Sequence, residues 1–162
     1  MMKITCLTVL LLLFTSVNPG LADDSAKLVG TWKVVSFETE FQATAARDTI
    51  LGKNPIGYIV YTADGRVMTL VTAAGLKAAT TDQERAQLWR SMTAWSGTYR
   101  VEGNKLIIKV DVSSMPTWVG TERALIFNID GNRLQTTSEW IDAPLYHEKG
   151  KIRTILTYER VK

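Results

Sequence analysis

Alternation of apolar and polar residues is clearest in the middle of the chain. From Trp95 to Glu102, apolar or small residues alternate with polar ones, and the same period resumes from Leu106 to Val112 after the turn Gly103-Asn104. Period-two alternation is typical of strands with one apolar and one solvated face. The segment therefore predicts an antiparallel hairpin whose apolar face lies inside the protein.

Shorter runs of β-branched and aromatic residues predict six more strands. Asp64-Gly65 between two such runs is a strong hairpin signal, and Gln42 to Pro55 has no clean period and predicts a loop. Closing eight antiparallel strands in sequence order removes the exposed sheet edges, so we expect an all-β, up-and-down barrel; a two-sheet sandwich is the alternative. The six further strands are expected at 28–41, 57–61, 66–72, 122–129, 133–141 and 152–161.

One short helix is expected between the third and fourth strands, over Asp82 to Thr93. Thr81 followed by Glu84 has the pattern of a capping box. Apolar residues fall within one arc of the helical wheel, among them Leu88 and Trp89. We expect this arc to dock on an apolar surface.

The first residues have the pattern of a secretory signal peptide. Lys3 precedes an apolar run from Ile4 to Phe14, and Gly20 and Ala22 place small residues at a cleavage site. The run is too short for a spanning helix, which needs about 20 residues. We therefore expect a signal peptide over 1–22, a domain over 23–162 with no transmembrane segment, and a periplasmic or secreted protein. The only cysteine is Cys6, so the expected mature chain has no disulfide.

Composition excludes several classes of function. The net charge of +3 is small and evenly spread along 162 residues, which argues against nucleic-acid binding. His147 is the only histidine and no cysteine follows the leader, so we expect no metal site and no catalytic triad. Neither a phosphate loop nor a dinucleotide fingerprint is present, and we expect no cofactor.

Several motifs recur in the order known from one family. They are Leu28-Val29-Gly30-Thr31-Trp32, Gly57-Tyr58-Ile59-Val60-Tyr61-Thr62, Asp64-Gly65-Arg66-Val67-Met68, Thr81-Asp82, Ser96-Gly97-Thr98-Tyr99, Trp118-Val119-Gly120-Thr121 and Tyr158-Glu159-Arg160. The chain thus resembles the bacterial lipocalin-like domain proteins, within the calycin group of lipocalins and fatty-acid-binding proteins. The resemblance implies an eight-stranded barrel with an apolar cavity.

The resemblance also implies how the barrel closes. An arginine of the last strand crosses the tryptophan of the first strand in the calycin pattern, which assigns a structural role to Gly30, Trp32 and Arg160. A guanidinium over an indole ring is worth roughly 0.5–2 kcal/mol. Arg123 is a second candidate for the same role.

Aromatic residues are the main candidates for ligand binding. The five tryptophans fit a filled core, but some of them are expected to line a cavity in which a few polar groups orient the ligand. We take as candidate ligand-binding residues Glu38, Tyr58, Met68, Trp95, Tyr99, Ile108, Phe127 and Trp140.

The first strand conflicts with a purely apolar interior. If Trp32 points inward, strict alternation brings Ser36 and Glu38 inward as well, unless a bulge shifts the register. A buried Glu38 needs a cationic partner such as Arg66, Arg123 or Arg153. Alternatively, Glu38 lies at the rim in water.

Three functions remain compatible with this pattern. We expect the barrel to bind a small apolar or amphipathic molecule without turnover. The first alternative is a cofactor-free isomerase or cyclase in which Glu38, Tyr58 or Tyr99 acts as the acid or base. The second is a structural or stress-related envelope protein with a filled core.

Overall fold

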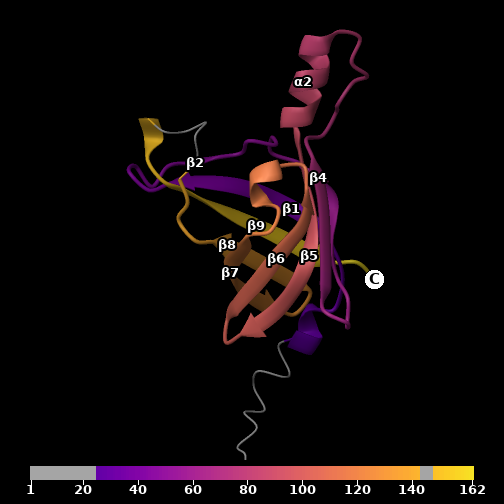
Figure 1. The fold of residues 1–162 in the computed structure, drawn as a ribbon, viewed down its shortest axis with the longest axis vertical. Helices are drawn as coiled ribbons and strands as arrows, with labels where there is room; N and C mark the ends of the chain where they lie inside the picture. The colour runs from indigo at the N-terminus through magenta and orange to yellow at the C-terminus, as the bar shows by residue number, and fades with distance from the viewer. Residues whose placement is uncertain (1–24, 143–147) are drawn as a thin grey trace, which may run out of the picture.

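A computed structural model describes residues 25–142 and 148–162 (Figure 1). The predicted signal peptide over 1–22 and the predicted loop residue His147 lie outside the described residues. Within these residues, no helix is both long and apolar enough to span a membrane.

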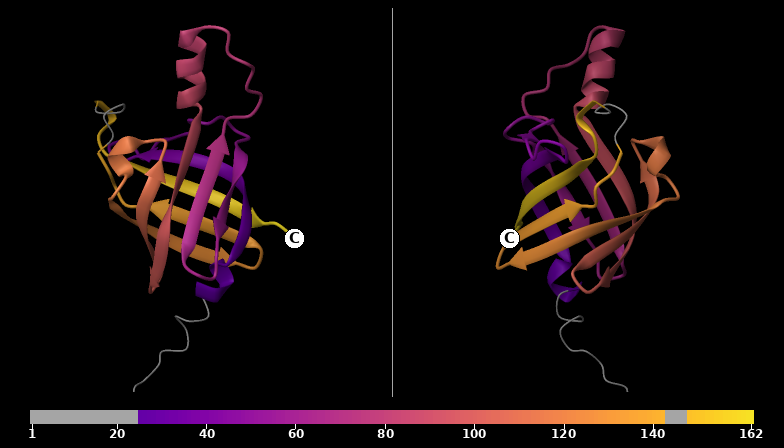
Figure 2. Two further views of the ribbon diagram at one scale, coloured as in Figure 1. Left: turned by 45° about the vertical axis from the view of Figure 1, so that its right-hand side comes forward. Right: turned by 90° about the vertical axis from the view of Figure 1, so that its left-hand side faces the viewer.

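The prediction of an eight-stranded antiparallel barrel is confirmed. The sheet order is β2-β1-β3-β4-β5-β6-β7-β8-β9, and a further pairing between β1 and β9 closes it (Figures 1 and 2). The short β2 (Arg47–Asp48) pairs only with the end of β1 and lies outside the closed ring. The barrel strands are β1 (Gly30–Phe41), β3 (Ile56–Tyr61), β4 (Arg66–Thr72), β5 (Met92–Glu102), β6 (Lys105–Ser113), β7 (Glu122–Asp130), β8 (Arg133–Ser138) and β9 (Ile152–Arg160).

One end of the barrel is sealed by the residues that lead into β1. Residues 25–28 form a helical turn there, and Leu28 is fully buried. Trp32 and Leu134 are also fully buried and belong to the same core cluster. Because β1 starts and β9 finishes at this end, we call it the closed end.

A bulge in β1 resolves the conflict along the first strand. Val34 pairs with Tyr158, whereas Ser36 pairs with Thr157, so Val35 is an extra residue. Such a bulge inverts which residues face inward along the rest of the strand. Trp32 and Val34 are buried before it, and Phe37 is buried after it, while Glu38 stays partly exposed.

The expected helix is present as α2 (Asp82–Arg90), and it lies between β4 and β5 as predicted. Both hydrogen bonds of the capping box join Thr81 and Glu84. The helix is shorter than expected because Met92 and Thr93 already pair with β4. The expectation that its apolar arc docks is wrong: no residue of α2 is buried, and the helix projects from the barrel (Figure 2).

Two connections carry short elements that the sequence pattern did not predict. The loop after β1 contains β2, and the connection between β6 and β7 contains the 3-10 turn η1 (Pro116–Trp118). The predicted strand 133–141 ends earlier, at Ser138, and Ile141 forms only an isolated bridge with Ile152. Both short elements lie at the end of the barrel opposite the closed end, because β1 and β6 finish there.

Candidate ligand-binding site

The inner face of the barrel carries aromatic and aliphatic residues from neighbouring strands. Ile108 and Phe127 are buried in the core cluster, and Trp95 and Tyr99 pack against it while remaining partly exposed. Four of the predicted ligand-binding residues therefore share the barrel interior. Leu125 and Leu156 contribute further inward apolar surface that is only partly buried.

Arg123 also belongs to the inner face, near the start of β7. It pairs with the buried Ile108 and precedes Leu125 by two residues, so the three side chains lie on one face. Its guanidinium carbon lies 3.9 Å from the ring centroid of Trp118 in η1. Among the described residues no carboxylate pairs with Arg123, and burial lowers the pKa of its guanidinium.

From the sequence, Arg123 was a candidate partner either of Glu38 or of Trp32 in the first strand. In the structure it contacts Trp118 instead. A signal for the observed position was present in the sequence. Arg123 alternates with Leu125, Phe127 and Ile129, which places all four on one face of a strand. The indole partner was not predictable in the same way, because Trp118 lies in an irregular connection.

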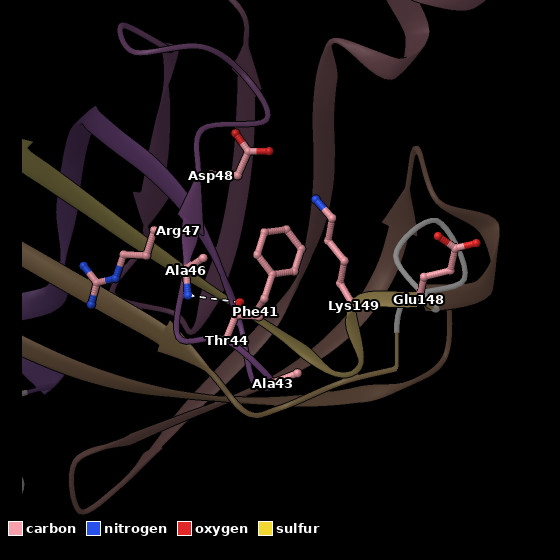
Figure 3. Close-up of a pocket in the computed structure, with 8 residues that line it drawn as sticks. All are labelled: Phe41, Ala43, Thr44, Ala46, Arg47, Asp48, Glu148 and Lys149. Atoms are coloured by element: carbon pink, nitrogen blue, oxygen red, sulfur yellow. Dashed lines mark hydrogen bonds between the residues drawn. The ribbon is translucent and has the colours of Figure 1, made fainter.

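An open cavity of about 420 Å³ lies where β1 ends (Figure 3). Arg123, near the start of β7, is at the same end of the barrel but does not line this cavity. Phe41 forms its apolar wall, and the ammonium group of Lys149 lies 4.5 Å from the ring centroid of Phe41. Arg47 and Asp48 of β2 line the other side. A second cavity of about 240 Å³ separates α2 from the 75–79 loop.

Glu38 lies outside the barrel interior, in a charged network on the outer surface. Arg47 donates to Glu38 Oε2 at 3.0 Å and to Glu40 Oε2 at 3.2 Å. Arg153 donates to the other oxygen of Glu40 at 2.9 Å, and its guanidinium lies 4.6 Å from the ring centroid of Trp140. Glu38 and Trp140 therefore belong to one network that fastens β2, β1 and β9 together.

The other candidate residues do not converge on one site. Tyr58 and Met68 are about half-exposed on the outer faces of β3 and β4. Tyr99 is on the inner face and donates its hydroxyl to the carbonyl of Thr62 at 3.0 Å. The three residues proposed for acid–base chemistry, Glu38, Tyr58 and Tyr99, thus occupy three separate places.

The closed end has the geometry that the family resemblance implied. The guanidinium carbon of Arg160 lies 4.1 Å from the ring centroid of Trp32, and its nitrogens donate to the carbonyls of Val29, at 2.8 Å, and Lys27. The indole nitrogen of Trp32 donates to the carbonyl of Leu28 at 2.8 Å. Gly30 has a φ of 134°, and a Cβ there would meet a guanidinium nitrogen of Arg160 at 2.8 Å.

Two tyrosines near the closed end, Tyr61 and Tyr158, are buried. The hydroxyl of Tyr61 has no hydrogen-bond partner among the described residues, whereas Thr136 partly offsets the rise that burial gives the pKa of Tyr158. The ring of Tyr61 packs edge-on against Tyr99 with centroids 5.1 Å apart. Burial raises the pKa of both Tyr61 and Tyr158 above the usual range, and for Tyr61 the neighbouring tyrosines add to the shift.

No cluster of three or more histidine, cysteine, aspartate or glutamate residues suited to a metal ion occurs within 25–142 and 148–162. The chemistry that the described interior offers is apolar contact, hydroxyl groups and one guanidinium.

Comparison with known proteins identifies the family. A family model described as "Lipocalin-like domain" matches residues 29–161. A crystal structure of a mutant of the fluorescent protein UnaG matches with 15% identity and a TM-score of 0.36, over 83% of this chain and 96% of that one. No curated protein matches. Because the family model matches nearly the whole described chain, the protein belongs to the lipocalin-like domain family.

Proposed function

We propose that the protein binds one small amphipathic molecule in the barrel interior, without turnover, with the anionic group of that molecule on Arg123. The observation that carries this proposal is the inward-facing guanidinium of Arg123, whose partner among the described residues is the ring of Trp118. Membership of a family of barrels supports the interior as the location.

Arg123 lies over the ring of Trp118, and none of its N–H groups donates a hydrogen bond to a described residue. A guanidinium that lies over an aromatic ring uses its face, while its N–H groups point outward in its own plane. A carboxylate, sulfonate or phosphate can accept two of these N–H groups at once. Burial already removes part of the hydration of Arg123, so an anion that arrives there compensates a desolvated charge.

Apolar side chains next to Arg123 suit the body of the same molecule. Leu125 follows on the same face of β7, and Trp95, Phe127 and Leu156 complete an inward apolar surface. Burial of apolar surface contributes about 25 cal/mol per Å², so contacts of this kind supply most of the affinity for a small ligand. The ligand class is therefore an apolar body with one anionic group.

A matched pair of fluorescent probes tests this assignment. 1-Anilinonaphthalene-8-sulfonate carries a sulfonate, and N-phenyl-1-naphthylamine is the same molecule without it. We expect the native protein to bind the sulfonate at least tenfold more tightly, in line with a charge-assisted hydrogen bond of about 1.5–3 kcal/mol. Arg123→Gln should abolish this preference and leave the affinity for the neutral probe within about twofold.

Arg133→Gln is the control, because Arg133 is exposed at the start of β8. It should keep the preference for the sulfonate. Equal affinity of native protein and Arg123→Gln for the sulfonate would refute the role of Arg123. Failure of both probes to bind folded native protein would refute a ligand-binding interior and favour a barrel with a filled core.

We further propose that the chain acts outside the cytoplasm after removal of residues 1–22. The charged residue, apolar run and small residues at the expected cleavage point support this proposal.

A further inference from the structure

The outer wall formed by β3, β4 and β5 is apolar where an antiparallel barrel ordinarily presents polar residues to water. Large hydrophobic side chains are 47–64% exposed on this wall and its neighbour β6. The set consists of Ile56, Tyr58, Met68, Leu70 and Val112, and we call it the apolar sheet face. In the left view of Figure 2 no other element covers this wall.

Strand register makes the apolar sheet face continuous. Tyr58 pairs directly with Leu70, which pairs with Ala94 on β5. One row further along, Met68 pairs with Ser96, and Ser96 pairs with Val112. Directly opposed residues lie on the same side of a sheet about 5 Å apart, so the exposed side chains adjoin one another across four strands.

The apolar sheet face is also uncharged. β3 contains no charged residue, and neither 67–72 of β4 nor 92–99 of β5 contains one. At its edges stand Lys33, which pairs with Tyr58, and Arg66, which forms a 2.5 Å ion pair with Asp111. A further lysine, Lys109, pairs with Thr98 on the β6 side of the face. A surface that docks on anionic lipid carries a cluster of four or more cations, whereas this rim holds two lysines and one neutral pair.

We propose that the apolar sheet face joins two copies of this chain in a symmetric dimer. A two-fold axis brings a surface onto itself, and an uncharged face can meet its own copy without like-charge repulsion. Two sheets packed in this way interdigitate their side chains about 10 Å apart, as in a β-sandwich.

The available area indicates a dimer of moderate stability. Four strands about 4.8 Å apart and three successive outward positions about 7 Å apart cover roughly 400 Å² per copy. Two copies then cover about 800 Å² of flat, projected area. Because the side chains protrude from this plane, the accessible area that they bury is larger and comes close to the ~1,000 Å² expected of a specific interface. We expect a dissociation constant in the micromolar range, so that the dimer separates into monomers on dilution.

Sedimentation velocity of the protein recovered from expression of the full chain tests the proposal between about 1 and 500 µM. The native protein should shift from monomer to dimer across this range. Leu70→Lys places a charge at the centre of the apolar sheet face and should weaken dimerisation at least tenfold. Ile126→Lys is the matched control, because Ile126 is equally exposed on the outer face of β7, away from this face, and should dimerise like the native protein.

Circular dichroism establishes that both variants remain folded, and Val112→Lys at the edge of the face replaces Leu70→Lys if that variant does not fold. A native protein that remains monomeric at 500 µM would overturn the proposal. So would dimerisation that Leu70→Lys leaves intact. Monomeric native protein that co-sediments with phosphatidylcholine–phosphatidylglycerol vesicles would assign the face to a lipid surface instead.

Discussion

Replacement of Arg160 by methionine tests how the closed end is held. Methionine keeps a long apolar stem but removes the guanidinium, which contacts the ring of Trp32 and donates to the carbonyls of Val29 and Lys27. The variant therefore loses the interactions that join the last strand to the residues leading into the first. Its effect should appear in stability, because none of these groups belongs to the proposed ligand site.

The expected magnitude follows from the separate contacts. A partly buried cation–π contact is worth about 0.5–2 kcal/mol, and a partly buried hydrogen bond from a charged donor is worth about 1.5 kcal/mol. The bond to Lys27 is exposed and adds little. The free energy of unfolding should fall by about 2–3 kcal/mol.

Urea denaturation followed by tryptophan fluorescence measures this loss. With a slope of about 1.5–2 kcal/mol/M, the midpoint should drop by about 1–2 M. Arg160→Lys retains the positive charge but lacks the planar guanidinium with its several N–H donors. Its free energy of unfolding should fall by roughly half as much. Arg133→Met is the exposed control and should stay within about 0.5 kcal/mol of the native protein. An equally small change for Arg160→Met would show that packing of Trp32 alone seals the barrel.

Four further predictions concern the described tyrosines, the helix and the leader. Tyr61→Phe removes a buried hydroxyl without a described hydrogen-bond partner, so the free energy of unfolding measured by calorimetry should stay unchanged or rise; a loss above about 1 kcal/mol would contradict this assignment. Because the folded state keeps both phenols protonated above their usual pKa, the free energy of unfolding should decline as pH rises above about 10, and urea titrations should show a shallower decline in Tyr158→Phe. Thr81→Ala should speed hydrogen exchange in α2 with little change in global stability, since no residue of α2 is buried; a global loss above 1 kcal/mol would refute this. Intact mass of the periplasmic protein should correspond to a chain that begins at Asp23, and an uncleaved chain would contradict export.

The sequence predicted the barrel well where alternation is strict. The strands around Trp95 and Leu106 were placed within two or three residues, because one face is apolar and the other polar. The cap of the helix at Thr81 was also predictable, since a capping box depends on residues three apart. The end of the helix was not, because pairing of Thr93 with Val71 overrides local propensity.

The site was less predictable because it depends on which face each strand turns inward. Ile56 to Tyr61 is apolar at every position, so its pattern could not show that Tyr58 faces outward. Alternation in β1 exposed a conflict, but only the structure places the extra residue at Val35. The partner of Glu38 is Arg47, which a loop of irregular sequence brings into position.

The extra residue in β1 constrains which insertions and deletions this chain tolerates. Deletion of Val35 would restore even spacing between Trp32 and the second half of the strand. Phe37 and Thr39 would then stay inward and Glu38 and Glu40 outward, because Val34 would still pair with Tyr158 and Ser36 with Thr157, now without a break in the alternation. The bulge therefore marks a position where the strand can lose one residue and keep its buried side chains buried, whereas insertion of one residue between Val34 and Phe37 would turn Glu38 and Glu40 inward unless a second bulge formed.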